Sequence, residues 1–229
     1  MSELFSIQLQ NRQQQGRDGV WLDLPTTTEQ VQAALRQIDI SSDNPQGLFI
    51  SGYFAEEEKR IAIPYNMVLA SNVDELNFLA ARLETLSAGE RAELNAALQT
   101  PQSEFSSIGR ITDFPENVDY YVHLPDVHGP AQLGDYYLNR SGMVDMPEEW
   151  KGGIDTAQFG RYVAQQEQGV FTEYGYLVKS GDAWQKVHEG QPVPEEYRVL
   201  SFPAPEVMRD AANIPPPVQP ETEPQKVIP

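Results

Sequence analysis

Residues 72–98 read NVDELNFLAARLETLSAGERAELNAAL, and this short stretch contains two helix starts. Asn72 is a suitable N-cap, because its side-chain oxygen can accept a hydrogen bond from an N–H group of the first turn. Ser87 and Glu90 form a capping box, in which each side chain bonds to the backbone of the other residue. Apolar residues follow at helical spacing: Val73, Leu76, Ala80 and Leu83 after the first cap, Leu94 and Leu98 after the second. The stretch therefore predicts two short antiparallel helices, which we assign to a helical unit over residues 64–102.

The residues before this stretch predict a small α+β unit over residues 1–63. Phe5–Leu9 alternates apolar and polar residues as an edge strand does, and Val20–Leu24 places Val20, Leu22 and Leu24 on one face. Thr26 and Glu29 are spaced as a capping box. Val31, Ala34, Leu35 and Ile38 follow at the spacing of one helical face, and Leu48–Phe54 is strand-like.

The residues after it predict a second α+β unit over residues 103–180. An aromatic strand is expected within Val118–His123, and Gly142 is a plausible end for a helix that contains Tyr136 and Tyr137. Asp155 can cap a further helix that Gly169 closes. Residues 181–229 are expected to form an extension and a Pro-rich, disordered tail.

The chain is strongly acidic. Among its 229 residues, 34 are Asp or Glu and 16 are Lys or Arg, so the formal net charge is −18. This charge repels nucleic-acid phosphates and anionic lipid, so direct binding to either is not expected. The acids are interleaved with core-forming residues, and the longest run is Glu56, Glu57 and Glu58. We therefore predict a folded body with a negative surface, whose charge either serves solubility alone or takes the place of a polyanion.

The sequence has no recognisable catalytic or cofactor-binding pattern. Without cysteine it has no disulfides, thiolate metal sites or cysteine nucleophiles. His123 and His128 lie either side of Pro125 and do not share a helical face, so no metal site is predicted. A phosphate-binding loop, a dinucleotide glycine motif and a serine nucleophile elbow are all missing from the sequence. We predict no enzymatic activity, no cofactor and no metal.

The first residues, MSELFSIQLQNRQQQG, have no basic region followed by an apolar run, so they do not resemble a signal peptide. No apolar run approaches the ~20 residues that span a bilayer. We expect a cytoplasmic protein without a membrane partner.

Aromatic residues are dense in the last predicted unit: Tyr120, Tyr121, Tyr136, Tyr137, Trp150, Phe159 and Tyr162. A unit of this size buries only a limited core. The aromatic residues therefore either fill that core or leave a surplus for self-association. For a homodimer, the interface candidates are Tyr120, Tyr121, Val122, Tyr136 and Tyr137.

Several blocks of residues resemble ArdA-type antirestriction proteins. The C-terminal signature of that family is similar to Ile154-Asp155, Phe159-Gly160-Arg161, Gly169-Val170-Phe171 and Tyr174-Gly175. Blocks nearer the N-terminus also resemble the family, in the family's order and spacing. They are Phe5–Leu9, Gly19-Val20-Trp21, Leu24-Pro25, Phe49–Tyr53, Asp74-Glu75-Leu76-Asn77, Tyr120–His123 and Tyr136–Gly142. The resemblance covers roughly residues 5–178.

The resemblance implies an elongated α+β tandem of three small domains, α+β, helical and α+β, that forms a curved homodimer through its third domain. It also implies an antirestriction function. Surface carboxylates would imitate the phosphates of bent B-form DNA and occupy the DNA-binding groove of type I restriction–modification enzymes. Such proteins occur on mobile genetic elements such as conjugative plasmids and transposons. Residues 179–229 extend beyond the resemblance.

The acids that we expect to act as phosphate surrogates lie on predicted outer faces and in loops. They are Glu75, Glu84, Glu90, Glu93, Asp113, Glu116, Asp119, Asp126, Asp135, Asp145, Glu148, Glu149 and Asp155. The alternative is an acidic adaptor or regulator of a mobile element that binds another basic partner, and the extension motivates it.

Overall fold

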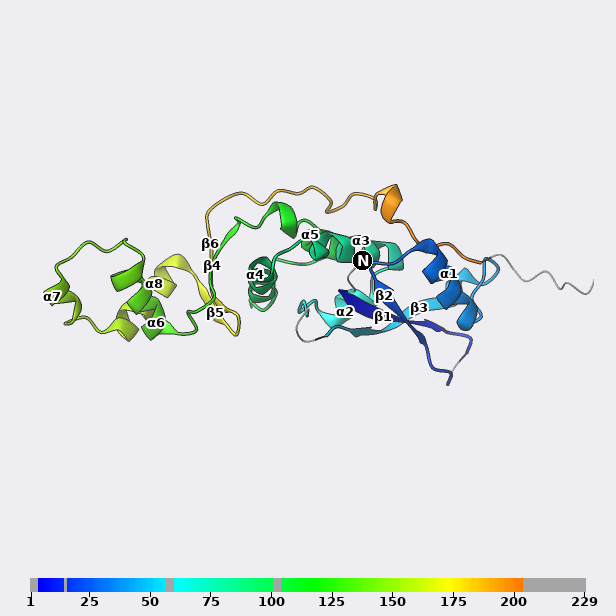
Figure 1. Cartoon of the computed structure of the whole chain (residues 1–229), viewed down its shortest axis with the longest axis horizontal. Helices are drawn as coiled ribbons and strands as arrows, with labels where there is room; N and C mark the ends of the chain where they lie inside the picture. The colour runs from blue at the N-terminus through cyan, green and yellow to red at the C-terminus, as the bar shows by residue number, and fades with distance from the viewer. Residues whose placement is uncertain (1–3, 15, 57–59, 101–103, 204–229) are drawn as a thin grey trace, which may run out of the picture.

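The structure is a computed structural model, and it describes residues 4–14, 16–56, 60–100 and 104–203. These residues form an elongated, mixed α+β protein with a small sheet in each half of its length (Figure 1). The strands are β1 (Phe5–Asn11), β2 (Val20–Leu24), β3 (Leu48–Phe54), β4 (Tyr121–Leu124), β5 (Val170–Thr172) and β6 (Gly175–Lys179). The α-helices are α1 (Thr28–Gln37), α2 (Tyr65–Leu69), α3 (Val73–Glu84), α4 (Ala88–Leu98), α5 (Ile108–Thr112), α6 (Pro130–Asp135), α7 (Glu148–Lys151) and α8 (Thr156–Glu167). Three-residue 3-10 turns are η1 (Pro45–Gly47), η3 (Phe114–Glu116) and η5 (Glu195–Tyr197), and η4 (Tyr136–Arg140) is a π-helical turn.

The N-terminal sheet has the strand order β2-β1-β3, and both pairs are antiparallel. β1 alternates buried and half-buried side chains, and it places Ile7 and Leu9 in the core. The prediction that Phe5–Leu9 is an edge strand is wrong, because β3 pairs with its second side. Alternation reports one buried face, and a central strand of an antiparallel sheet has the same pattern when its other face meets solvent.

Helix α1 begins one residue later than predicted. Its N-cap is Thr27, which forms a capping box with Gln30. The predicted box of Thr26 and Glu29 is wrong, because Thr26 is buried and its N–H donates to Asn77 Oδ1 at 2.7 Å. The predicted apolar face is confirmed, since Val31, Ala34, Leu35 and Ile38 are buried.

Both helix starts in residues 72–98 are confirmed. Asn72 caps α3 in a capping box with Glu75, and Ser87 caps α4 in a capping box with Glu90. The two helices do not run antiparallel, because α3 follows the long axis of the molecule and α4 crosses it (Figure 1). Each helix packs mainly elsewhere, α3 against α5 and α4 against β6. Caps specify where helices begin, whereas their crossing angle depends on these distant partners.

Residues 121–179 form a distal lobe around the antiparallel sheet β4-β6-β5. Helices α6 and α8 make the closest helix contact in the lobe, because glycines meet there. A Cβ on Gly160 would lie 1.8 Å from the carbonyl oxygen of Pro130, and a Cβ on Gly134 would lie 1.9 Å from that of Thr156. The two backbones therefore touch with no side chain between them.

The ends of the lobe helices agree in part with prediction. Asp155 caps α8 as predicted, and Gly142 follows η4 with a φ of +70°. The left-handed residue that ends α8 is Gln168, with a φ of 57°, and not Gly169. Gly169 is needed for space, since a Cβ there would lie 1.9 Å from Tyr176 Oη.

Buried side chains form two clusters. The larger contains the N-terminal sheet and helices α1 to α5, and it reaches Leu177 and Val199. The smaller lies inside the distal lobe and consists of Val127, Leu133, Ala164 and Tyr176. The mixed α+β class is confirmed, while the three-domain tandem with boundaries at 63, 102 and 180 stays a prediction.

The chain beyond the lobe returns along the rest of the protein. Residues 181–203 pass α5 and α3 and end beside α1 (Figure 1). Residues 204–229, which hold most of the predicted Pro-rich tail, lie outside the described residues.

Candidate partner-binding surface

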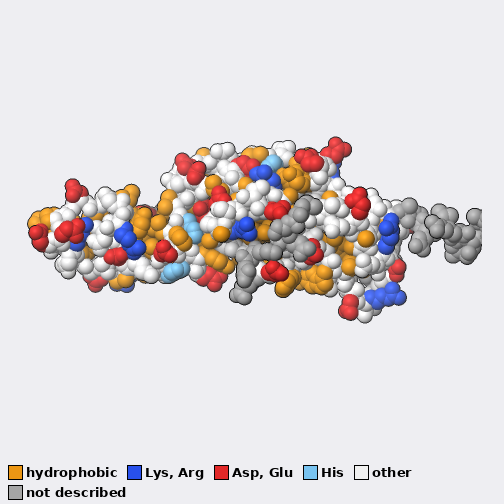
Figure 2. All heavy atoms as spheres, viewed as in Figure 1, with side chains coloured by type: hydrophobic (Ala, Val, Ile, Leu, Met, Phe, Trp, Pro, Cys, Tyr) orange, Lys and Arg blue, Asp and Glu red, His pale blue; other side chains and the backbone are white. Residues whose placement is uncertain are grey.

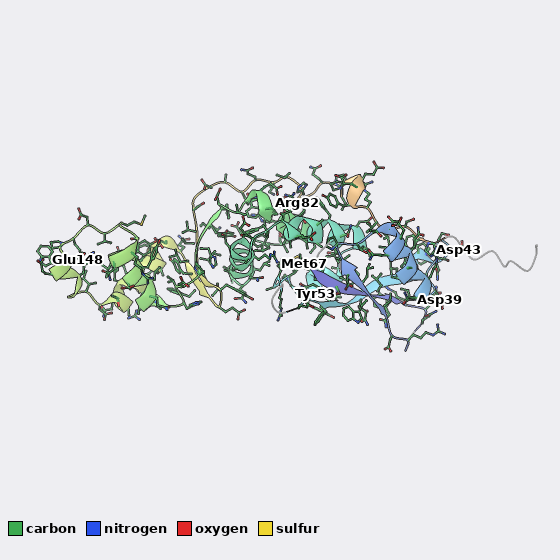
Figure 3. All side chains as sticks on the ribbon, viewed as in Figure 1. Asp39, Asp43, Tyr53, Met67, Arg82 and Glu148 are labelled. Carbon is green, nitrogen blue, oxygen red and sulfur yellow. The ribbon has the colours of Figure 1, made fainter. Side chains whose placement is uncertain are left out.

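Carboxylates are spread over the whole length of the molecule (Figure 2). Asp39 and Asp43 lie at one end, and Glu148 lies at the far end of the distal lobe (Figure 3). Of the predicted phosphate surrogates, the exposed ones are Asp119, Asp126, Asp145, Glu148, Glu149 and Asp155. The half-buried ones are Glu75, Glu84, Glu90, Glu93, Glu116 and Asp135, and Asp113 is buried.

Many of the bases are already paired with acids of the same chain. Arg140 lies 2.9 Å from Asp135, and Lys151 lies 2.6 Å from Glu148. Further ion pairs are Arg17–Asp39, Arg82–Glu116, Arg110–Glu104, Lys179–Glu104 and Lys186–Glu189. The exposed ones among these pairs, such as Arg17–Asp39 and Arg140–Asp135, add little stability. Their effect on the surface is larger, because the positive groups are neutralised locally and the remaining acids set its potential.

Three of the predicted acids are fixed in place because their side chains take part in helix N-caps. Glu75 and Glu90 accept hydrogen bonds from the N-cap backbones of α3 and α4. The hydrogen bonds from Ser87 lower the pKa of Glu90, so this carboxyl group stays ionised at neutral pH. Asp155 Oδ1 accepts the Gln158 N–H at 2.9 Å. A capped carboxylate is held rigidly, as a charge array that matches a partner requires.

Four other acids point into solvent without an ion pair among the described residues. They are Asp119, Asp126, Asp145 and Glu149, and all four are exposed. Because they contribute to no cap or ion pair in that part of the chain, their charges are available to an external cation.

Asp113 does not belong to this surface. Its side chain is fully buried, and it accepts the N–H groups of His188 and Glu189 at 2.6 and 3.3 Å. Its carboxylate is therefore unavailable to an external partner. Glu116 is likewise engaged, in a half-buried pair with Arg82.

Glu93 differs from the other acids in its charge. Burial, and then the charges of Glu90 and Asp119, raise the pKa of Glu93 to about 8. Its Oε1 atom is buried without a hydrogen-bond partner among the described residues. Glu93 is therefore largely protonated at neutral pH, which makes it a poor phosphate surrogate.

Sequence reasoning missed exposed acids in the first unit and in the extension, including Asp23, Asp39, Asp43, Glu195 and Glu196. Asp23 had a usable signal, because it alternates with the inward-facing Leu22 and Leu24 on β2. The acids of the extension had none, since their exposure depends on where the extension packs.

The predicted dimer residues divide between core and surface. Tyr136 and Tyr137 pack against the lobe core, and Tyr121 packs against the larger core. The ring of Tyr120 lies 5.1 Å from that of Trp184. Only Val122 is an exposed member of the predicted set, at 45%. The lobe also exposes Met143, Trp150 and Tyr162.

A hollow lies beside the extension. It is an open groove of about 650 Å³ between α2, α3, α5 and the extension, lined by Met67, Phe78, Ile108, His188 and Val193 among others. In the described ranges, no three His, Asp or Glu side chains gather as a metal site requires. No helix there is long and apolar enough to cross a bilayer.

Comparison with protein families identifies the family of the chain. A family model described as "Antirestriction protein (ArdA)" matches residues 15–178, which is more than half of the chain. No curated protein matches the chain. The matched range ends within β6, so the extension lies outside it.

Proposed function

Because the chain belongs to the ArdA family of antirestriction proteins, we propose that it inhibits type I restriction–modification enzymes as a mimic of B-form DNA. Family membership implies an antirestriction function and a non-catalytic one. That the protein mimics DNA, and that its target is a type I enzyme, are the further step that we propose beyond family membership. The observation that carries this step is the array of exposed carboxylates along an elongated body, in which seven of the thirteen described bases are paired with acids of the same chain.

The physical basis is replacement of phosphates by carboxylates. DNA carries one charge per ~1.7 Å of its axis, and a protein groove that binds it presents Lys and Arg side chains. A rigid acidic protein that enters this groove releases counterions as DNA does. Contacts to phosphates carry no sequence information, so a mimic of the backbone blocks the groove whatever its recognition sequence.

We further propose a homodimer, because two copies would lengthen the charge array. Val122 on the edge strand β4 and the exposed Trp150 and Tyr162 give the distal lobe apolar surface for such an interface. The adaptor alternative lacks a comparable observation. Its motivation was the extension, and residues 181–203 are hydrogen-bonded to their own chain.

Competition with DNA tests the proposal. The protein is titrated into a type I enzyme bound to labelled DNA, at about 50 mM and about 200 mM salt. We expect displacement that weakens steeply as salt rises. Failure to displace DNA at either salt, by a folded protein, refutes the mimicry.

A set of four substitutions tests which acids act. Asp119→Asn, Asp126→Asn, Asp145→Asn and Glu149→Gln remove exposed charges that form no ion pair among the described residues. The combined variant should bind more weakly, and its binding should depend less steeply on salt than that of the unsubstituted protein, because fewer carboxylates pair with bases of the groove. The matched control exchanges Asp for Glu and Glu for Asp at the same positions, and it should retain binding. Equal weakening in both variants would show that the enzyme recognises the shape of these side chains and not their charge.

A further inference from the structure

Residues 181–203 form a long return segment with a three-residue helical turn, η5, as their one helix. This segment leaves the distal lobe at the end of β6 and follows α5 and α3 to the neighbourhood of α1 (Figure 1). At its end, the Ser42 N–H donates to the Pro203 carbonyl oxygen at 3.1 Å. The extension therefore connects the lobe with the opposite end of the protein.

The chain enters and leaves the distal lobe at one point. β4 and β6 are antiparallel, and Tyr121 pairs with Lys179. Next to this pair, the Ser180 N–H donates to the Tyr120 carbonyl oxygen at 3.0 Å. The lobe also touches the body near this point, since β6 packs against α4 and Leu177 lies in the larger core. All these contacts lie at the near end of the lobe, so anchors of the extension farther along the body would add leverage against pivoting.

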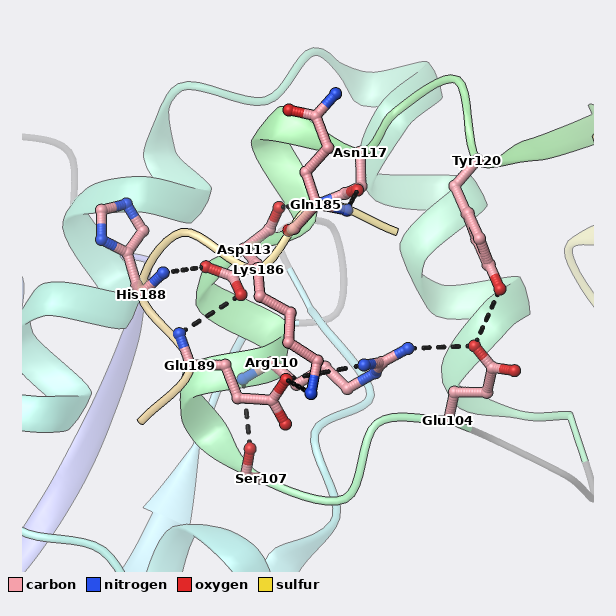
Figure 4. A network of polar contacts seen from close by, with 10 residues as sticks. All are labelled: Glu104, Ser107, Arg110, Asp113, Asn117, Tyr120, Gln185, Lys186, His188 and Glu189. Atoms are coloured by element: carbon pink, nitrogen blue, oxygen red, sulfur yellow. Dashed lines mark hydrogen bonds and ion pairs between the residues drawn. The ribbon is translucent and has the colours of Figure 1, made fainter. Parts of the chain in front are cut away.

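The first anchor of the extension is made by two side chains around η3 (Figure 4). Asn117 holds Gln185 through its amide oxygen and its amide nitrogen, at 2.7 and 3.0 Å. The Asp113 carboxylate accepts the N–H groups of His188 and Glu189. A buried carboxylate with these two donors gives charge-assisted hydrogen bonds, which are stronger than neutral ones.

An aromatic and ionic contact strengthens the same region. The ring of Trp184 lies 5.6 Å from that of Phe105, and the Arg110 guanidinium lies 4.6 Å from the Trp184 ring. Arg110 also pairs with Glu189 at 3.5 Å and with Glu104 at 3.0 Å (Figure 4). The extension is thus packed as well as hydrogen-bonded.

The second anchor lies on α3. Asp74 Oδ1 accepts the N–H groups of Val199 and Leu200, at 2.8 and 2.7 Å. Asn77 donates to the Tyr197 carbonyl oxygen and accepts the Thr26 N–H, so one side chain joins the extension to the chain before α1. Val199 is buried in the larger core.

We infer that residues 181–203 are a splint, which fixes the distal lobe relative to the rest of the protein through Asp113, Asn117 and Asp74. These three are positioning residues: they hold the extension, and the extension holds the orientation of the lobe. The link from orientation to inhibition rests on the proposed function, because a mimic of DNA needs its charges in register along both parts. The splint itself does not depend on that function.

Spin labels test the splint directly, because the chain has no cysteine of its own. Thr85→Cys at the end of α3 and Gln166→Cys on α8 place labels at exposed positions in the body and the lobe. The labelled chain is mixed with an excess of unlabelled chain, so that the distances measured lie within one copy, and the full chain should then give one narrow distance distribution. A chain that stops after Ser180 should give a broader one, whereas a chain that stops after Pro203 should match the full chain.

If the shortened chain fails to fold, point variants test the splint instead. Asp113→Asn and Asp119→Asn remove the same charge from neighbouring positions, one buried at the anchor and one exposed. Asp113→Asn should broaden the distance distribution and speed amide exchange of His188 and Glu189 by about 10- to 100-fold. Asp119→Asn should do neither.

The outcomes separate the splint from the proposed function. Unchanged distances in both the Ser180 stop and Asp113→Asn overturn the splint. Broadened distances together with full-strength displacement of DNA overturn its link to inhibition. A full chain that displaces no DNA refutes the proposed function, and the label distances still decide whether the splint exists.

Discussion

The contact between α6 and α8 gives the sharpest stability prediction. In Gly160→Ala, the new Cβ would lie 1.8 Å from the Pro130 carbonyl oxygen, and real Cβ contacts stay at 3.0 Å or above. The helices must therefore separate by at least 3.0 − 1.8 = 1.2 Å. Overpacking costs about 1–3 kcal/mol when side chains move aside. Here a backbone carbonyl must move in a lobe with a core of four buried residues, so we expect about 3 kcal/mol.

Amide hydrogen exchange resolves this destabilisation within the distal lobe. A change of about 3 kcal/mol corresponds to roughly 100-fold faster exchange in α6 and α8 if they open together. Gly152→Ala is the matched control, since a Cβ there meets nothing within 4 Å. Exchange in Gly160→Ala at the rate of the unsubstituted protein would refute the close backbone contact.

Three further predictions concern a cap, a titration and self-association. Ser87→Ala removes the N-cap of α4 and should cost about 1 kcal/mol in thermal unfolding, while Ala at the exposed Ser106 should not. The folded-state pKa of Glu93 is about 8, above its usual 4.5, so the folded protein binds the extra proton and loses stability as pH rises between these values. Glu93→Gln should therefore stabilise the protein against urea at pH 8 and have little effect at pH 4, whereas an equal effect at both values would contradict the burial of this carboxyl group. Val122→Asp should shift a homodimer towards monomer in sedimentation, and Val187→Asp, at similar exposure on the extension, should not; a concentration-independent monomer mass of the unsubstituted protein would contradict the dimer.

Local patterns predicted the elements whose causes are local. The caps Asn72, Ser87 and Asp155 each lie where the sequence places them, because a cap and its first-turn partner are three residues apart. The apolar face of α1 is confirmed for the same reason. The predicted capping box of Thr26 is the exception, because the Thr26 N–H donates a hydrogen bond to Asn77 in α3, which lies far along the chain.

Long-range packing could not be predicted from these patterns. The position of β1 in the centre of its sheet depends on β3, and the crossing of α4 depends on β6. The tight approach of Gly134 to Gly160 brings together two isolated glycines that the sequence shows only as turns or close-packing points. The course of the extension is of the same kind, because each of its anchors lies on a distant helix or turn.

The acids themselves show why a charge count does not define the surface. Asp113 and Asp119 are near neighbours with the same side chain, yet one is buried against backbone N–H groups and the other is exposed. Neutralising Asp119 removes charge from the surface, whereas neutralising Asp113 loosens the splint and displaces many charges at once. Weaker inhibition by an Asp113 variant would therefore report geometry and not a missing phosphate surrogate. Only variants chosen by burial can separate the two contributions, and the pair Asp113→Asn and Asp119→Asn makes that separation with one charge removed in each.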